Sequence, residues 1–146
     1  MREISDIGSV SHVVQLAVAP VFLLTAIAAM LTVLTNRLSR IIDRARVLEV
    51  TLESTPAEKA ADLHAELVIL SRRSKHISLA ITLCTTTALL VCTVIAILFL
   101  GNFFQFDFAI TIALLFITAM LLLVAAFLVF LREIFIATAN IRIGPR

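Results

Sequence analysis

The stretch ISLAITLCTTTALLVCTVIAILFL, residues 77–100, decides the fold, because its 24 residues carry no charge. A helix rises about 1.5 Å per residue, so about 20 apolar residues cross a hydrocarbon core of about 30 Å. In lipid, every backbone amide must be paired within its own segment, which favours a helix. Two further charge-free runs, residues 13–35 and 108–131, have similar length. The sequence therefore predicts an all-α membrane protein with three transmembrane helices.

The composition points the same way. Of the 146 residues, 61% are hydrophobic and 15% are charged, whereas a soluble domain has about 45–50% apolar and about 25% charged residues. So short a chain keeps much of its surface exposed and cannot hide this excess in a core. The composition therefore argues against a soluble enzyme, a disordered tail and a secreted disulfide scaffold. Cys84 and Cys92 stand about 12 Å apart along one predicted helix, which is too far for a disulfide, and we interpret both as packing residues.

The basic residues are sorted along the chain in a way that predicts topology. The connection at residues 101–107 has no Lys or Arg, and the tail after residue 131 has three Arg. The segment between the first two runs, residues 36–76, is called the connector here. By the positive-inside rule, the connector and the C-terminus face the cytoplasm and the N-terminus faces outside. The connector holds eight basic residues: Arg37, Arg40, Arg44, Arg46, Lys59, Arg72, Arg73 and Lys75.

The connector itself has a helical pattern. Thr55, Pro56 and Glu58 have the spacing of a helix start, with a cap, a first-turn proline and an acidic residue three positions after the cap. On both sides of this break the apolar residues recur three and four positions apart, which is typical of a coiled coil. We therefore expect an antiparallel coiled hairpin that continues the first and second spans. The two apolar stripes are Leu38, Ile41, Ala45, Leu48 and Leu52, then Ala60, Leu63, Leu67 and Leu70.

Folding the connector at Thr55 and Pro56 separates its charges. Basic residues gather beside the membrane, where each Lys or Arg near an anionic leaflet gains about 1 kcal/mol. They form a candidate lipid-headgroup collar, although topology determination alone also explains them. Acidic residues gather at the tip, either as a solvated helix end or as a site for a basic protein partner. The collar is Arg37, Arg40, Arg44, Arg72, Arg73 and Lys75, and the acidic tip is Glu49, Glu53, Glu58, Asp62 and Glu66.

Hydroxyl-bearing residues recur on one side of the predicted spans. Small and hydroxylated side chains let membrane helices approach closely and share hydrogen bonds. Packing explains this pattern, and so does a pore lined by hydroxyl groups, which would need several subunits because three helices cannot enclose a wet path. We therefore expect a homo-oligomer. The candidate pore or packing face is Ser78, Thr82, Thr86 and Thr93 of the second span with Thr25 and Thr32 of the first.

Catalytic and metal motifs are not found in the sequence. His12, His64 and His76 fall too far apart on the predicted helices to share one metal. With three glycines there is no phosphate-binding loop, and no serine lies in a nucleophile elbow. No Asp, Glu, Lys, Arg or His lies in the middle of a span, which argues against a proton-driven transporter. We therefore predict a non-enzyme without metal or cofactor, and no nucleic-acid binding because the basic residues adjoin the membrane.

Two motifs resemble a known family. The segments LAVAPVFLL, residues 16–24, and LTNRLSRIIDRAR, residues 34–46, are similar to a family of small bacterial membrane proteins known only as domain of unknown function 2721. The likeness extends from about Val13 to about Ala137 and is most specific over residues 35–46. The resemblance implies a bacterial inner-membrane protein with three helices, and it brings no activity, substrate or catalytic residue.

These observations leave two functional hypotheses. The first is a homo-oligomeric ion channel or permeation pathway, which the hydroxyl residues favour. The second is a membrane-anchored scaffold that binds a cytoplasmic partner through the connector. The predicted segments are an outer N-terminal interfacial segment 1–12, spans 13–35, 77–100 and 108–131, the connector 36–76, an outer turn 101–107 and a cytoplasmic tail 132–146.

Overall fold

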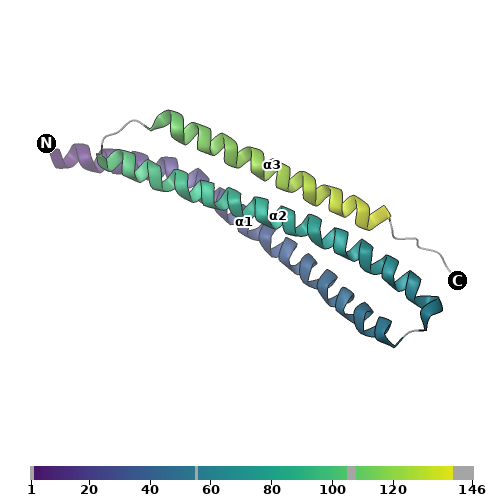
Figure 1. The fold of residues 1–146 in the computed structure, drawn as a ribbon. Coiled ribbons are helices and arrows are strands. Elements are labelled where there is room, and N and C mark those ends of the chain that lie inside the picture. Colours follow the sequence, from purple (N-terminus) through teal and green to yellow (C-terminus); the bar gives the residue numbers. More distant parts are fainter. Residues whose placement is uncertain (1, 55, 105–107, 140–146) are drawn as a thin grey trace. The chain divides into compact units, whose positions relative to one another are not determined.

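The computed structural model describes residues 2–54, 56–104 and 108–139, and its three elements are all α-helices (Figure 1). Helix α1 is Arg2–Glu53, α2 is Ala57–Phe104 and α3 is Ala109–Ala139. Each contains a stretch long and apolar enough to cross a membrane. The predicted all-helical class with three apolar helices is thus confirmed. Residues 105–107 of the predicted turn and 140–146 of the predicted tail lie outside the described residues.

Local chemistry explains where the helices run and end. Helix α1 continues through Pro20, which is buried although its ring removes one backbone hydrogen bond. At the end of α1, the backbone N–H and the hydroxyl of Ser54 both donate to the carbonyl of Thr51, at 3.2 and 3.0 Å. Phe108 precedes α3 and accepts from the Ile112 N–H at 2.9 Å. The Ser54 bonds satisfy a carbonyl that the end of α1 leaves unpaired, and the Ile112 bond is the first regular backbone bond of α3.

The chain divides into two compact units, each containing part of all three helices. Unit 1 comprises residues 1–31 and 83–124, and unit 2 comprises residues 32–82 and 125–146. Several buried residues of unit 1 are small, which is typical of the contact faces of membrane helices. Thr87 is fully buried and donates its hydroxyl to the Leu83 carbonyl at 2.8 Å, which leaves no unsatisfied donor. The buried residues of unit 1 include Ala17, Pro20, Ile27, Cys84, Thr87, Val91, Val94, Ala119 and Leu123.

Unit 2 has a core of the same kind with one charged member. Its apolar members are large side chains from α1 and α2 together with alanines. Glu133 of α3 joins them with no exposed surface. The buried residues of unit 2 include Leu34, Ile41, Leu48, Leu70, Ile77, Ala80, Ala126 and Glu133.

Buried positions recur every seven residues on each helix. This spacing is that of a coiled-coil seam, where every second turn returns a side chain to the same face. It extends the stripe predicted for the connector, of which Ile41 and Leu48 are buried and Leu38, Ala45 and Leu52 half-buried. The rows are Ile27, Leu34, Ile41 and Leu48 on α1, Leu70, Ile77, Cys84 and Val91 on α2, and Ala119, Ala126 and Glu133 on α3.

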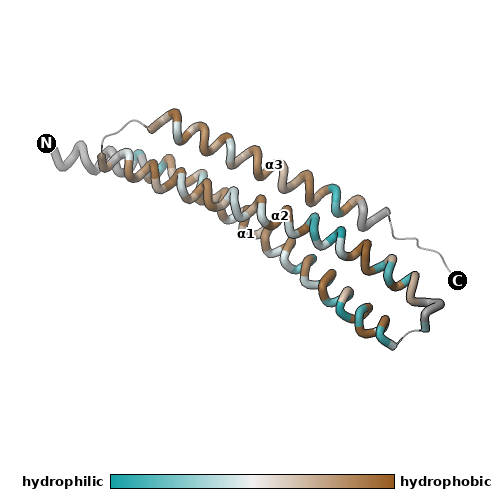
Figure 2. The backbone as a smooth tube through the Cα atoms, in the orientation of Figure 1, coloured by the Kyte–Doolittle hydropathy of each residue, from teal (hydrophilic) through white to brown (hydrophobic). Residues whose placement is uncertain are grey.

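Most of the apolar surface lies on the outside of the chain. Only 17–22% of the most apolar window of each helix is buried within the chain. All three helices carry exposed leucine, isoleucine and phenylalanine side chains. Polar residues concentrate in the stretches of α1 and α2 next to their connection (Figure 2). Such a surface is stable where lipid surrounds the apolar part.

Candidate functional site: an arginine-lined cavity

A buried ion pair joins α2 and α3 within unit 2. The Nε of Arg73 donates to Oε1 of Glu133 at 2.8 Å. The Glu133 side chain is 1% exposed and that of Arg73 is 26% exposed. Oε2 of Glu133 is buried and has no hydrogen-bond partner among the described residues. A buried carboxylate is stable only when it is paired and its oxygens accept hydrogen bonds. Oε2 of Glu133 therefore lacks a hydrogen-bond donor that its burial requires.

Three arginines of α1 lie near this pair. The Nε and Nη2 atoms of Arg44 both donate to Oε1 of Glu66, at 3.3 and 3.0 Å. Both side chains are well exposed, so this pair is worth less than about 1 kcal/mol. The guanidinium of Arg37 lies 5.2 Å from the centre of the Phe130 ring, as in a cation–π contact. Arg40 is exposed and forms no ion pair with the residues that the structure describes.

These side chains surround one cavity of unit 2. Its volume is about 240 Å³, several times the roughly 30 Å³ of one liquid water, so it can hold a group of several atoms. Buried residues form its floor, and the exposed Arg40 and Arg44 form its rim. The lining holds four arginines and one glutamate, so its formal charge is positive. The lining residues are Arg37, Arg40, Ile41, Arg44, Leu70, Arg73, Ile77 and Glu133.

The structure divides the predicted collar into residues that line this cavity and residues that do not. Four of its members line the cavity: Arg37, Arg40, Arg44 and Arg73. The other two, Arg72 and Lys75, are exposed and do not belong to the lining. The predicted collar thus contains a basic cavity with defined walls, together with two solvated cations.

The predicted hydroxyl face lies on the outside of the chain. Thr82 and Thr93 donate to the carbonyls of Ser78 and Leu89 on their own helix, at 3.0 and 2.9 Å. Thr25 does the same toward Val21 at 3.4 Å. These bonds satisfy the hydroxyl donors without a neighbouring helix. Every member is exposed: Ser78, Thr82, Thr86 and Thr93 on α2, and Thr25 and Thr32 on α1.

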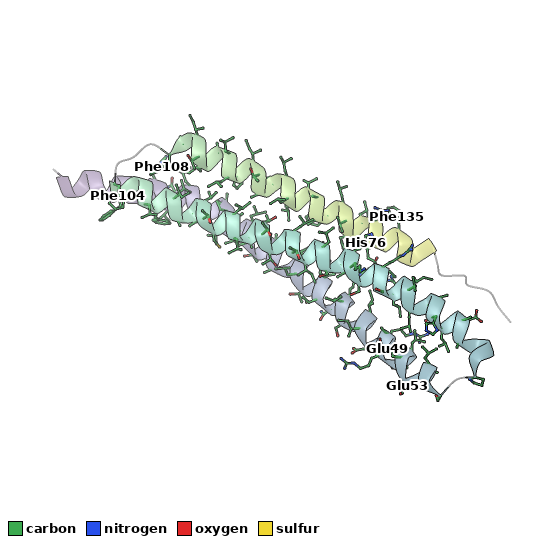
Figure 3. The ribbon with its side chains drawn as sticks, in the orientation of Figure 1. Glu49, Glu53, His76, Phe104, Phe108 and Phe135 are labelled. Atoms are coloured by element: carbon green, nitrogen blue, oxygen red, sulfur yellow. The ribbon has the colours of Figure 1, made fainter. Side chains whose placement is uncertain are left out.

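The acidic tip adjoins a second and larger cavity of unit 2. Figure 3 shows Glu49 and Glu53 near the end of α1 that leads into α2. Glu49 and His64 belong to the lining of a cavity of about 480 Å³. The Nδ1 of His64 lies 2.9 Å from the Ala60 carbonyl. Within the described residues, no three His, Cys, Asp or Glu side chains lie close enough to share a metal ion.

A third cavity, in unit 1, has an almost wholly apolar wall. Phe104 and Phe108 line it from the two sides of the α2–α3 connection (Figure 3). Its volume is about 450 Å³. Among the described residues of its lining, Thr111 is the polar one.

Sequence reasoning missed Glu133 as a site residue and assigned it to the tail. The heptad row Ala119, Ala126 and Glu133 was the available signal, since it places the carboxylate in the position of a core residue. Its pairing with Arg73 joins residues 60 positions apart, which no local pattern reveals. Phe130, which faces Arg37, was also missed.

Three long apolar helices with exposed apolar surfaces define the class as a multi-pass membrane protein. The model of one family matches residues 17–143, and its description is protein of unknown function, DUF2721. The chain belongs to this family, as its motifs at residues 16–24 and 34–46 indicate. No curated protein and no solved structure matches the chain.

Proposed function

We propose that the protein is the subunit of a homo-oligomeric permeation pathway for ions in the bacterial inner membrane. The observation that carries this proposal is the exposure of Ser78, Thr82, Thr86 and Thr93 on α2. Within the chain these hydroxyl groups pack against no core. Their side chains lie on the outside of the chain, where a second copy or a water-filled path between copies can meet them.

The chemistry of the spans favours a passive pathway. A coupled transporter places an acidic, basic or histidine side chain at mid-membrane, and the three apolar runs hold no Asp, Glu, Lys, Arg or His. A hydroxyl group that turns its hydrogen from the helix carbonyl toward the path can replace part of the hydration shell of an anion without binding it tightly. Arginines at the connector end, above all Arg37 and Arg40, would give the mouth of such a pathway a preference for anions. In this proposal the N-terminus lies outside, the connector and C-terminus lie in the cytoplasm, and the protein is neither an enzyme nor a nucleic-acid binder.

Planar-bilayer recording of the purified protein tests this function, with Thr86→Leu as the diagnostic variant. An apolar ring in a narrow path excludes water, so we expect the single-channel current to fall several-fold. Thr118→Leu is the matched control, because Thr118 of α3 is exposed and donates to the Leu114 carbonyl, as Thr82 and Thr93 of α2 donate to carbonyls of their own helix. A silent bilayer, or an equal change in both variants, contradicts the proposal.

A scaffold is the second candidate, favoured by apolar residues exposed beyond the charge-free runs. Val47, Val50 and Val68 of the connector are 54–65% exposed, and Ile42 and Ile69 are 43% exposed. Isolated exposed valines are ordinary, but several on one pair of helices indicate an interaction surface. The acidic tip would then select a basic partner.

Capture experiments distinguish the scaffold from the channel. A partner retained by the full chain and lost in a Val47→Ser, Val50→Ser variant, together with a silent bilayer, supports the scaffold. Retention by both forms contradicts a role for this surface. Ser39→Ala is a suitable control, since Ser39 is an exposed connector residue outside the apolar positions.

A further inference from the structure

The arginine-lined cavity of unit 2 holds more positive charge than its own carboxylates compensate. Arg73 is paired with Glu133 and Arg44 with Glu66. Arg37 and Arg40 form no ion pair with any described residue, yet both line the same 240 Å³ space. Like charges in a shared cavity repel, and an anion between them removes the repulsion. Planar guanidinium groups suit the oxygen atoms of a phosphate in particular.

The position of the cavity along the helices indicates where this phosphate comes from. Arg37 follows the first charge-free run, Ile77 begins the second and Glu133 follows the third. All three line the cavity. The cavity therefore lies at the ends of the three apolar segments, next to the first charged residues that flank them. This is the depth at which lipid headgroups lie. Lipid phosphate is present there at far higher local concentration than any dissolved anion.

Glu133 restricts which lipid headgroups fit the cavity. Glu133 belongs to the lining, and its Oε2 atom is buried and accepts no hydrogen bond from the described residues. A fully ionised phosphate alone would be repelled by this oxygen. A headgroup that carries an N–H or O–H donor next to its phosphate satisfies both the arginines and the carboxylate.

We propose that this cavity binds the phosphate of a donor-bearing lipid headgroup, with Arg37 and Arg40 on the phosphate and Glu133 on the adjacent ammonium or hydroxyl group. Phosphatidylethanolamine and phosphatidylglycerol have this chemistry. Phosphatidylcholine has the phosphate without a donor. The site belongs to a single chain and does not depend on ion permeation.

Lipid titration of the purified full chain, followed by native mass spectrometry, tests the site. Phosphatidylethanolamine and phosphatidylcholine with identical acyl chains are the first pair of probes, because both have zero net charge. We expect tighter binding of the ethanolamine lipid. Arg40→Gln removes one charge-assisted hydrogen bond, so we expect at least about tenfold weaker binding. Arg72→Gln is the matched control, since Arg72 is an exposed cation of the same unit outside the lining.

Arg40→Lys keeps the charge and loses the planar fork, so an intermediate affinity supports the phosphate contact. It also serves if Arg40→Gln is poorly folded, which thermal unfolding without added lipid reveals. Competition by inorganic phosphate at the concentration of the lipid would assign the same site to free hydrogen phosphate, the other source of this chemistry. Equal binding of the choline lipid, or equal losses in the Arg40 and Arg72 variants, overturns the proposal.

Discussion

The ion pair between Arg73 and Glu133 predicts an asymmetric response to mutation. Arg73→Leu leaves a carboxylate that is 1% exposed without its partner, and removing one member of a buried pair costs about 3–5 kcal/mol. Glu133→Leu leaves Arg73, which is 26% exposed and can turn its guanidinium toward headgroups or water. That variant loses mainly the charge-assisted hydrogen bond, worth about 1.5–3 kcal/mol. The arginine substitution should therefore be the more damaging one.

The double variant completes the cycle. Replacing both members of a buried pair by apolar residues of similar size is often neutral or stabilising. We expect Arg73→Leu, Glu133→Leu to unfold within about 1 kcal/mol of the natural chain, because leucine suits the heptad position after Ala119 and Ala126. Because the single changes cost about 3–5 and about 1.5–3 kcal/mol and the double change costs at most about 1 kcal/mol, the coupling energy between the two sites should be at least about 3.5 kcal/mol.

Reversible unfolding of the four proteins in one mixed-micelle composition measures these differences. A Glu133→Leu variant that is as unstable as Arg73→Leu would show that burial of the carboxylate does not control the outcome. A double variant that loses the sum of both single changes would show that the two side chains act independently. Either result refutes the reasoning from the buried pair.

Three further predictions concern the rest of the chain. Arg44→Gln should lower the free energy of unfolding by less than about 1 kcal/mol in the same assay, since both partners of the Arg44–Glu66 pair are well exposed, and a larger loss would contradict this. Leu34→Ala should cost about 2–5 kcal/mol because Leu34 is fully buried, whereas Val33→Ala, at an exposed site, should cost less than about 0.5 kcal/mol; equal effects would refute the assigned packing face. In a chain with Cys84→Ala and Cys92→Ala, a Glu49→Cys variant should react with an impermeant maleimide only after cell lysis, and labelling of intact cells would reverse the topology.

The helices could be predicted from the sequence because length and charge-free composition decide them. The same holds for continuity of α1 into the connector, since no Gly or Pro interrupts residues 36–54 and the apolar stripe keeps its spacing. In lipid the backbone has few alternatives, so a strong local signal is also a reliable one. The connector's cytoplasmic location and coiled pairing stay predictions.

The site was predicted only in part. The arginines next to the first span mark a membrane boundary in any sequence, but their convergence with Arg73 depends on the register between two helices. A carboxylate after an apolar run is ordinarily taken as the solvated end of a span, which is why Glu133 was assigned to the tail. For the hydroxyl residues, the pattern was visible in the sequence but the side of the helix that is packed was not. The buried hydroxyl is Thr87, whereas the predicted face lies outside, and periodicity alone could not distinguish the packed side from the exposed one.

The 60-residue separation of Arg73 and Glu133 also has a consequence for biogenesis. At about 5–20 residues per second, a ribosome completes Glu133 about 3–12 s after Arg73. The arginine has therefore already emerged when the third segment arrives with its acid. The ion pair can therefore form only after the third helix has been made, and a nascent chain that stops short of Glu133 carries Arg73 without this partner.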